Sequence, residues 1–218
     1  MNIYSVLSIL VLFVMLGYSG YVYSDLPQVM VTHFGIDGVP NGWMKKDFAV
    51  SFLPVLSVLL YLGLMYLPKI DPLARNYPSF RKQYDIFIFA FVLFLASIQM
   101  MLLNFGLGSR VPMERVVLPG LGILFLAIGN VLRHSERNWF VGIRTPWTMS
   151  SDVVWRGTHL FASRLFIGTG IFAIFSVGFP RIAIVGTVLL SILTSILSIL
   201  YSYVLYQKNK PDSTHATE

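Results

Sequence analysis

The sequence predicts an all-α, polytopic membrane protein, a bundle of six transmembrane helices. Only 12% of the 218 residues are charged and 56% are hydrophobic, whereas about a quarter of a soluble domain is charged. The mean hydropathy is +0.70. A soluble fold of this size could not cover itself with so few charges, so most of the surface must face lipid. Cysteine is absent, which excludes disulfides, thiolate metal sites and a cysteine nucleophile.

Six apolar segments are long enough to cross a hydrocarbon core of about 30 Å at about 1.5 Å per residue. A cleaved signal peptide has Lys or Arg before its apolar run and a small-x-small cleavage site after it. The first segment has neither, so it is expected to be a transmembrane helix. Pro54 lies inside the second and predicts a kink, which is tolerable if a neighbouring helix satisfies the freed carbonyl. The segments are residues 1–24, 48–67, 86–109, 116–132, 160–180 and 182–207.

The order of these segments predicts two modules and a tail. Residues 1–67 form a two-helix N-terminal module. Its outer loop, 25–46, contains the glycines and prolines of turns rather than of a long helix. Residues 84–207 form a four-helix domain with a polar loop at 133–159, and residues 208–218 form a polar tail.

Six crossings place both termini on one side of the membrane, and the distribution of Lys and Arg orients the bundle. The side with the termini holds ten of these residues and the opposite side five, with Arg164 left out because it lies inside a segment. This excess predicts a plasma-membrane protein with both termini and the polar loop in the cytoplasm. The formal charge of +6 is scattered between apolar runs, so it does not indicate nucleic-acid binding.

The sequence carries no ordinary catalytic signature, neither a zinc-binding His-Glu-x-x-His helix nor a phosphate-binding glycine loop nor a nucleophile elbow. No Asp or Glu lies in the middle of an apolar segment, which argues against proton-coupled transport and aspartyl proteolysis. We therefore expect no enzymatic activity and no cofactor.

A small-molecule transporter or channel is the alternative function, with Gln99, Asn104 and Arg164 lining its path. Gln99 and Asn104 more often hydrogen-bond to neighbouring helices than bind a substrate. Arg164 lies about one turn into the fifth segment, where its long stem can reach the membrane surface. Otherwise it pairs with an acid such as Asp152 or binds an anionic group.

The outer loop holds three side chains that could bind a divalent metal, Asp25, His33 and Asp37. They lack the tight spacing of a metal site, so a hydrogen-bonded structural histidine is the favoured interpretation and no metal is expected. Lys45 and Lys46 follow Trp43 after one intervening residue. Tryptophan and lysine side chains both settle at the lipid headgroups. Trp43 is therefore expected to anchor the loop at the membrane surface.

The centre of the polar loop has a definite local chemistry. Pro146 disfavours helix at Thr145, so the chain is extended or turning there. Arg144 is the strongest candidate for binding, because a guanidinium can hold a carboxylate, carbonyls or a lipid phosphate through two bonds. The alternative is an elbow at the membrane surface that only returns the chain to the bilayer.

A second helix is expected to follow this centre. Thr148 or Ser150 can cap it, and Trp155 and His159 then lie on one of its faces because they are four residues apart. A metal-dependent membrane enzyme built on this histidine or on His33 is a third hypothesis.

Together, the two loops resemble the SdpI family of bacterial and archaeal membrane proteins. The family pattern reads N-x-x-x-G-I-R-T-P-W-T and then V-W-x-x-T-H. A module commonly found ahead of it reads L-P-x-x-x-x-x-H-F-x-x-x-G-x-P-x-x-W. Gly35 and Asn41 depart from the commoner residues of that module, which argues against a metal in the outer loop. The matching residues are Asn138, 142–148, Val154, Trp155, Thr158 and His159, and Leu26, Pro27, His33, Phe34, Gly38, Pro40 and Trp43.

The resemblance implies an integral membrane immunity protein rather than an enzyme. The best-known family member protects cells against a secreted peptide toxin and passes the toxin's presence to a cytoplasmic repressor. The expected partners are the lipid bilayer, a peptide toxin outside and a cytoplasmic regulator inside. The candidate ligand- or partner-binding residues are His33, Asp37, Trp43, Arg144, Thr145, Pro146, Trp147, Trp155, His159 and Arg164.

Overall fold

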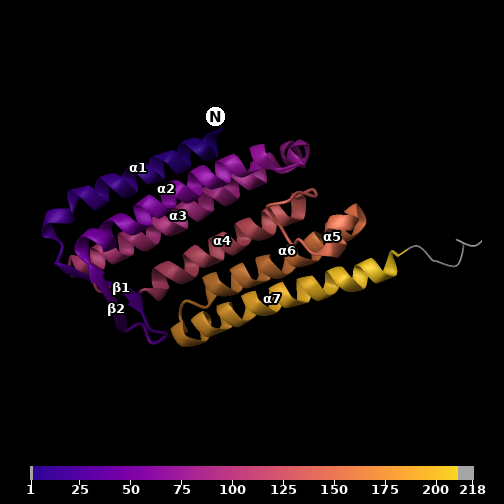
Figure 1. The fold of residues 1–218 in the computed structure, drawn as a ribbon. Coiled ribbons are helices and arrows are strands. Elements are labelled where there is room, and N and C mark those ends of the chain that lie inside the picture. Colours follow the sequence, from indigo (N-terminus) through magenta and orange to yellow (C-terminus); the bar gives the residue numbers. More distant parts are fainter. Residues whose placement is uncertain (1, 211–218) are drawn as a thin grey trace, which may run out of the picture.

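The computed structural model describes residues 2–210, so the end of the expected polar tail, 211–218, lies outside the described residues. Six helices are long and apolar enough to cross a membrane, which confirms the predicted all-α bundle (Figure 1). The chain is a multi-pass membrane protein. The six helices are α1 (Ile3–Tyr21), α2 (Lys46–Ile70), α3 (Arg81–Gly106), α4 (Glu114–His134), α6 (Asp152–Phe175) and α7 (Pro180–Lys208).

Five short elements connect these helices. The outer loop forms an antiparallel hairpin rather than turns alone, with Val31 paired to Trp43 and a register shift on either side of His33. Gly38 reverses the chain at its tip with φ of +75°, a conformation that glycine adopts without steric cost. The short elements are η1 (Tyr23–Asp25), β1 (Val29–Phe34), β2 (Pro40–Lys45), η2 (Ala74–Phe80) and α5 (Pro146–Ser150).

The start of the fifth predicted segment was wrong. The helix α6 begins at Asp152 instead of residue 160, so Trp155 and His159 lie in the membrane helix itself. The predicted caps were also wrong, because the Ser151 side chain accepts a hydrogen bond from the Val154 amide and caps α6. Hydropathy placed the boundary too late, because the first two turns of α6 contain the charged Asp152 and Arg156 and the buried polar Thr158 and His159, which lower the local hydropathy.

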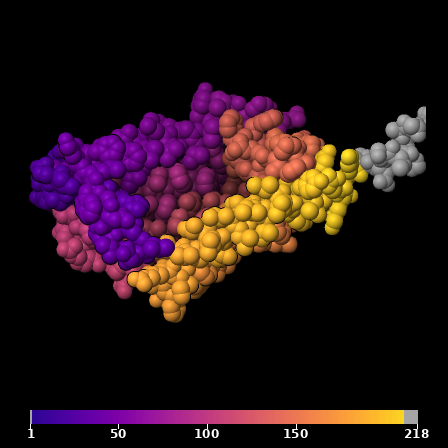
Figure 2. Space-filling view, turned by 60° about the horizontal axis from the view of Figure 1, so that its bottom comes forward, coloured from indigo at the N-terminus to yellow at the C-terminus, as the bar shows by residue number. Residues whose placement is uncertain are grey.

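Helices α3 and α4 lie side by side in the middle of the bundle (Figure 1). The helices α1 and α2 pack on α3, whereas α6 packs on α4 and α7 packs on α6. The hairpin and the connections 107–113 and 176–179 lie at one end, and the first and last described residues, 2 and 210, lie with 71–80 and 135–151 at the other. Figure 2 shows a face on which the surface recedes between α2 and α7.

The buried face of α7 is more polar than its exposed face. The helix α7 buries small and hydroxyl-bearing residues, Ala183, Thr187, Thr194, Ser198 and Ser202, and exposes isoleucine, leucine and valine. Small residues let helices approach closely in lipid, where apolar side chains gain nothing by leaving the membrane. The exposed apolar side chains therefore form the lipid-facing surface.

Two prolines inside α2 leave carbonyls without their usual partners, and α3 supplies replacements. Pro54 has no amide hydrogen, so the Val50 carbonyl four residues earlier loses its helical bond; Gln99 Nε2 donates to it at 3.1 Å. In the same way Pro68 frees the Leu64 carbonyl, which accepts from the Tyr84 hydroxyl at 2.6 Å. This confirms that Gln99 bonds a neighbouring helix, as the sequence favoured.

The bond to the Val50 carbonyl can be tested by a double-mutant cycle. We expect Gln99→Leu to lower the free energy of unfolding by about 1–2 kcal/mol, because a carbonyl within the membrane loses its partner. In a Pro54→Ala background the restored amide bonds the same carbonyl, so the Gln99→Leu cost should fall by about half or more. Unfolding in detergent micelles measures both costs.

Gln83→Leu is the matched control, since this glutamine lies on the partly exposed first turn of α3. It should change stability little in either background. Equal costs for Gln99→Leu with and without Pro54 would contradict the proposed pairing.

Candidate functional site

The predicted binding residues fall into two groups at opposite ends of the bundle. His33, Asp37 and Trp43 lie on the hairpin. The residues Arg144, Thr145, Pro146, Trp147, Trp155 and His159 lie in or beside the connection 135–151, which we call the signature loop, at the end that carries the termini.

Asn138 organises the first half of the signature loop. Its side chain is fully buried. The amide nitrogen donates to the carbonyls of Glu136 and Val141, both at 2.9 Å, and the amide oxygen accepts from the amides of Phe140 at 3.0 Å and Val141 at 2.6 Å. One asparagine therefore satisfies four backbone groups and closes a tight turn.

The connection 71–80 holds this turn from the side of α2. The buried Asp71 carboxylate accepts from the Tyr77 hydroxyl at 3.0 Å and from the Trp139 amide at 2.9 Å. Asn76 Nδ2 donates to the Arg137 carbonyl at 2.6 Å. These bonds tie the N-terminal helices to the signature loop. The sequence analysis did not single out Asp71 or Tyr77, and no local pattern pointed to them.

A buried pair from α6 fixes the middle of the loop. The rings of Trp155 and His159 stack with centroids 3.9 Å apart, which confirms that they share a face. His159 Nε2 accepts from the Ile143 amide at 3.0 Å, and Nδ1 donates to the Trp155 carbonyl at 2.7 Å. This arrangement requires the neutral imidazole, with its proton on Nδ1. The Trp155 indole donates to the Ser135 carbonyl at the end of α4, at 2.9 Å.

Gly142 is the residue that permits this contact. Its φ of +118° is one that other residues rarely adopt, and an added Cβ would overlap His159 Nε2. Gly142 of the G-I-R-T-P-W-T string must therefore be glycine, because His159 of the V-W-x-x-T-H string occupies the space that a side chain would need.

The second half of the loop is a short capped helix. Thr145 is extended, as Pro146 predicted, and forms a reciprocal capping box with Thr148 at the start of α5. Thr145 also contacts Ser202 of α7 across 3.1 Å between their hydroxyl oxygens. The Trp147 ring packs edge-on against Tyr203, with centroids 5.0 Å apart. These contacts serve structure, because the hydroxyls of Thr145 and Thr148 are already paired within the chain and the Trp147 ring packs on α7.

Two arginines at this end and one midway along α6 have different environments. Because α6 begins at Asp152, Arg164 lies about three turns into the helix and not one turn as expected. Arg137 pairs with Asp152 at 3.1 Å and donates to the Met149 carbonyl at 2.8 Å. Arg164 is exposed on α6, and the expected alternative pairing of Arg164 with Asp152 is wrong because Arg137 takes that acid. Arg144 is also exposed and bonds the Trp139 carbonyl through Nη1, which leaves its other donors available.

At the opposite end the hairpin is fixed at its base. The buried Lys46 donates to the carbonyls of Tyr23 at 3.2 Å and Leu26 at 3.4 Å. The Tyr23 hydroxyl donates to the Asp47 carboxylate, and this bond raises the pKa of Tyr23 above its ordinary value. The base of the hairpin is therefore held to α2, whereas its tip reaches across the end of the bundle toward the start of α7 (Figure 1).

The predicted hairpin residues lie apart from one another. His33 Nδ1 bonds the side-chain amide oxygen of Asn41. Asp37 accepts from the backbone amide of Val39 within the turn at 3.1 Å. The Trp43 side chain is 57% exposed. Within residues 2–210 no group of three His, Asp or Glu side chains is placed to hold a metal ion.

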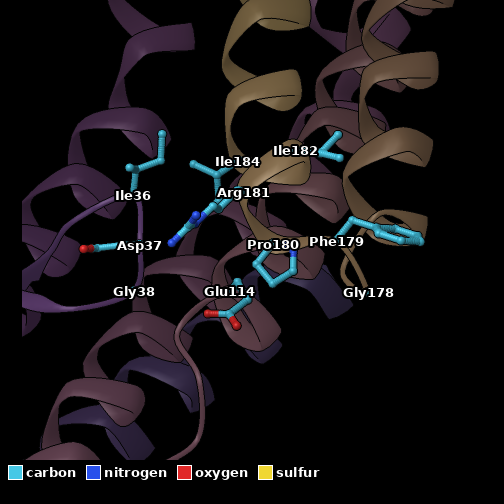
Figure 3. Close-up of a pocket in the computed structure, with 10 residues that line it drawn as sticks. All are labelled: Ile36, Asp37, Gly38, Glu114, Gly178, Phe179, Pro180, Arg181, Ile182 and Ile184. Atoms are coloured by element: carbon cyan, nitrogen blue, oxygen red, sulfur yellow. The ribbon is translucent and has the colours of Figure 1, made fainter.

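The hairpin tip faces the start of α7 across an open crevice of about 510 Å³ (Figure 3). Ile36, Asp37 and Gly38 line one wall, and Glu114 of α4 lies beneath the tip. Arg181 extends from α7 toward the hairpin (Figure 3). In the described part of the chain neither Glu114 nor Arg181 takes part in an ion pair. The crevice thus presents charges of both signs beside apolar side chains, and the sequence analysis had not linked these residues.

A transport path through Gln99, Asn104 and Arg164 finds no support in this geometry. Gln99 is fully buried and bonded to α2, Asn104 accepts from the Tyr18 hydroxyl of α1 at 3.0 Å, and Arg164 lies on the surface of α6. The side-chain amides of Gln99 and Asn104 join α3 to neighbouring helices, as the sequence favoured. Arg164 lies on α6, which packs on α4 and α7 rather than on α3.

Comparison with known proteins confirms the predicted relationship to the SdpI family. Residues 135–205 match the SdpI/YfhL protein family, and residues 10–58 match a domain of unknown function, DUF1648. The chain is 26% identical over 206 residues to the "Immunity protein SdpI" of Bacillus subtilis (strain 168), an alignment that covers 94% of this chain and 96% of that protein. No solved structure matches the chain.

The fit of Gly142 against His159 can be tested directly. We expect Gly142→Ala to destabilise the protein by about 1–3 kcal/mol, because the backbone becomes strained and the Ile143–His159 bond is displaced. Tryptophan fluorescence should shift as Trp155 becomes more exposed. Gly168→Ala is the control, since this helical glycine of α6 has open space around its Cβ position. If both substitutions left stability and fluorescence unchanged, the packing role of Gly142 would be wrong.

Proposed function

On the premise that residues 135–205 form an SdpI/YfhL family domain, we propose that this membrane protein is an immunity protein that protects the cell against a secreted peptide toxin. The observation that carries the proposal is the similarity to the Bacillus subtilis immunity protein over 94% of the chain. That similarity extends over all six helices and both ends of the bundle, and is not confined to the short signature strings. The proposed role is binding and signalling rather than catalysis.

The proposed location is the plasma membrane, with both termini and the signature loop in the cytoplasm. The end that carries the termini holds ten Lys and Arg residues and the hairpin end five. Cytoplasmic loops are enriched in these residues, so the hairpin faces outward. This orientation exposes the hairpin tip to a toxin that arrives from outside.

The proposed toxin-binding site is the crevice between the hairpin tip and the start of α7. It is formed by both modules, because Asp37 comes from the hairpin and Arg181 from the C-terminal helices. A peptide has apolar side chains and charged ends or side chains of both signs, and the crevice offers partners for each. A ligand held between the two walls would change their separation, which offers a physical route from binding to signalling.

The cytoplasmic regulator is proposed to bind the exposed side of the signature loop. Trp139 is 50% exposed and Pro146 is exposed beside it, while the rest of the loop is held rigidly by Asn138 and His159. A rigid loop with an exposed aromatic residue is typical of a protein-binding surface.

A protection assay tests the function and the crevice together. The protein is expressed in cells that lack their own immunity protein and are exposed to culture medium of a strain that secretes the toxin of such a system. We expect survival, and we expect Arg181→Glu to lower the tolerated toxin concentration about tenfold or more, which corresponds to about 1.4 kcal/mol of binding.

Arg110→Glu makes the same change of charge at the same end but outside the crevice, so it should keep protection. Killing of cells that express the unaltered protein in the membrane would contradict the immunity function. Equal protection by both variants would contradict the crevice as the toxin site.

Thiol labelling of intact cells tests the orientation, because the chain has no cysteine of its own. Val39, 56% exposed near the hairpin tip, and Ser150, exposed on the signature loop, are replaced singly by cysteine. A membrane-impermeant reagent should label Val39→Cys, and should label Ser150→Cys only after the cells are opened. Labelling of Ser150→Cys alone in intact cells would invert the proposed orientation.

A further inference from the structure

A lateral groove at the end of the bundle that carries the termini opens between the two modules. It has a volume of about 310 Å³. Leu64 and Leu67 of α2 form one wall, Phe166 of α6 forms the other, and Phe87 of α3 and Ile128 of α4 lie between them. All of these side chains are hydrocarbon and lie in helices that cross the membrane. At this depth the groove faces lipid, and a polar ligand would lose its hydration there without gaining partners.

The signature loop closes one end of this groove. Residues 140–143 line it, and Gly142 also lines a second, more polar pocket of about 500 Å³ that contains Trp139, Arg144 and Thr145. The two cavities therefore meet at the loop. One is apolar and lies within the membrane, and the other is polar and lies at its surface.

Arg144 supplies the charge of the polar pocket. Its Nη1 bonds the Trp139 carbonyl, which positions the guanidinium while Nε and Nη2 remain free to donate. The two acids nearest in sequence are Glu136 and Asp152; Asp152 pairs with Arg137, and within the described residues Glu136 forms no ion pair. The buried Asp71 carboxylate is engaged elsewhere, because it accepts from Tyr77 and Trp139. The guanidinium thus has no carboxylate of its own within residues 2–210.

We propose that the groove and the Arg144 pocket together bind one anionic phospholipid. An acyl chain fills the apolar groove against Leu67 and Ile128, and the headgroup phosphate accepts hydrogen bonds from Arg144. A guanidinium suits a phosphate because two parallel N–H donors match two oxygens. The exposed Trp139 ring lies at the headgroup level, where indoles settle. The end of the bundle with more Lys and Arg is also the one expected at an anionic leaflet.

This site gives the signature loop a ligand that is present before any toxin or regulator arrives. The lipid would contact Phe140, Val141 and Ile143 directly, and Ile143 is bonded to His159. Loss of the lipid would leave the groove and the loop without their packing. The inference does not depend on the proposed immunity function, because it uses only the apolar walls and the free guanidinium.

Native mass spectrometry of the purified full chain tests the proposal, with phosphatidylglycerol and phosphatidylcholine of identical acyl chains as the probes. We expect one phosphatidylglycerol to be retained about five- to tenfold more tightly than phosphatidylcholine. Both headgroups carry a phosphate, but the choline cation of phosphatidylcholine repels the guanidinium and cancels the net negative charge of the headgroup. Arg144→Gln should remove this preference, while Arg144→Lys should keep part of it, because a lysine remains cationic but cannot form the paired bonds.

Two further variants separate the site from general surface charge. Arg133→Gln removes an exposed cation from the same end of the bundle that lines neither cavity, and should keep the preference. Leu67→Trp narrows the groove and should weaken retention of both lipids without removing Arg144. Gel filtration and thermal unfolding confirm that each variant is folded. Excess inorganic phosphate should not displace the lipid from the unaltered protein, because a free phosphate ion makes no contact with the apolar groove.

Four results would overturn the proposal. Equal retention of the two lipids by the unaltered protein would remove the role of charge. An equal loss of preference in Arg133→Gln and Arg144→Gln would show that surface charge alone attracts the lipid. Displacement by inorganic phosphate, or full retention in Leu67→Trp, would show that no acyl chain occupies the groove.

Discussion

The arrangement of this bundle depends on one constraint, that a backbone carbonyl inside the membrane must find a hydrogen-bond donor. Helix α2 breaks the usual pattern twice, at Pro54 and Pro68, and each break leaves a carbonyl that no residue of α2 can satisfy. Gln99 and Tyr84, both on α3, provide the donors. These bonds fix the rotation of α3 against α2. Because α3 also packs on α4, the same contacts set the position at which the C-terminal helices begin.

The signature loop obeys the same constraint outside the regular helices. Asn138, Asp71 and His159 together satisfy the backbone groups that a turn of this kind leaves unpaired. Most polar residues of the signature strings are consumed in this way and hold the loop in one conformation. Arg144 keeps free donors and Trp139 stays exposed, whereas the buried Thr158 hydroxyl has no hydrogen-bond partner among the described residues.

Contacts between distant parts of the chain are present at both ends of the molecule. At the signature-loop end, Asp71 and Asn76 bond the backbone of the signature loop. At the hairpin end, Phe34 of the hairpin packs edge-on against Phe105 of α3. The crevice lies beyond this contact, between the hairpin tip and α7, and within the described residues no ion pair crosses it. The charges that line the crevice are therefore not used to hold the two modules together.

The sequence by itself determined the six membrane helices, because long apolar runs with few charges have one stable environment. It also carried the resemblance of residues 135–205 to the SdpI/YfhL family. The extended residue before Pro146 and the shared face of Trp155 and His159 followed from the sequence as well, since each rests on neighbouring residues. Tertiary structure alone decided the hairpin, the early start of α6 and the roles of Asp71, Tyr77 and Gly142. Their partners lie far away in the chain, and a local pattern carries no information on which distant groups will meet.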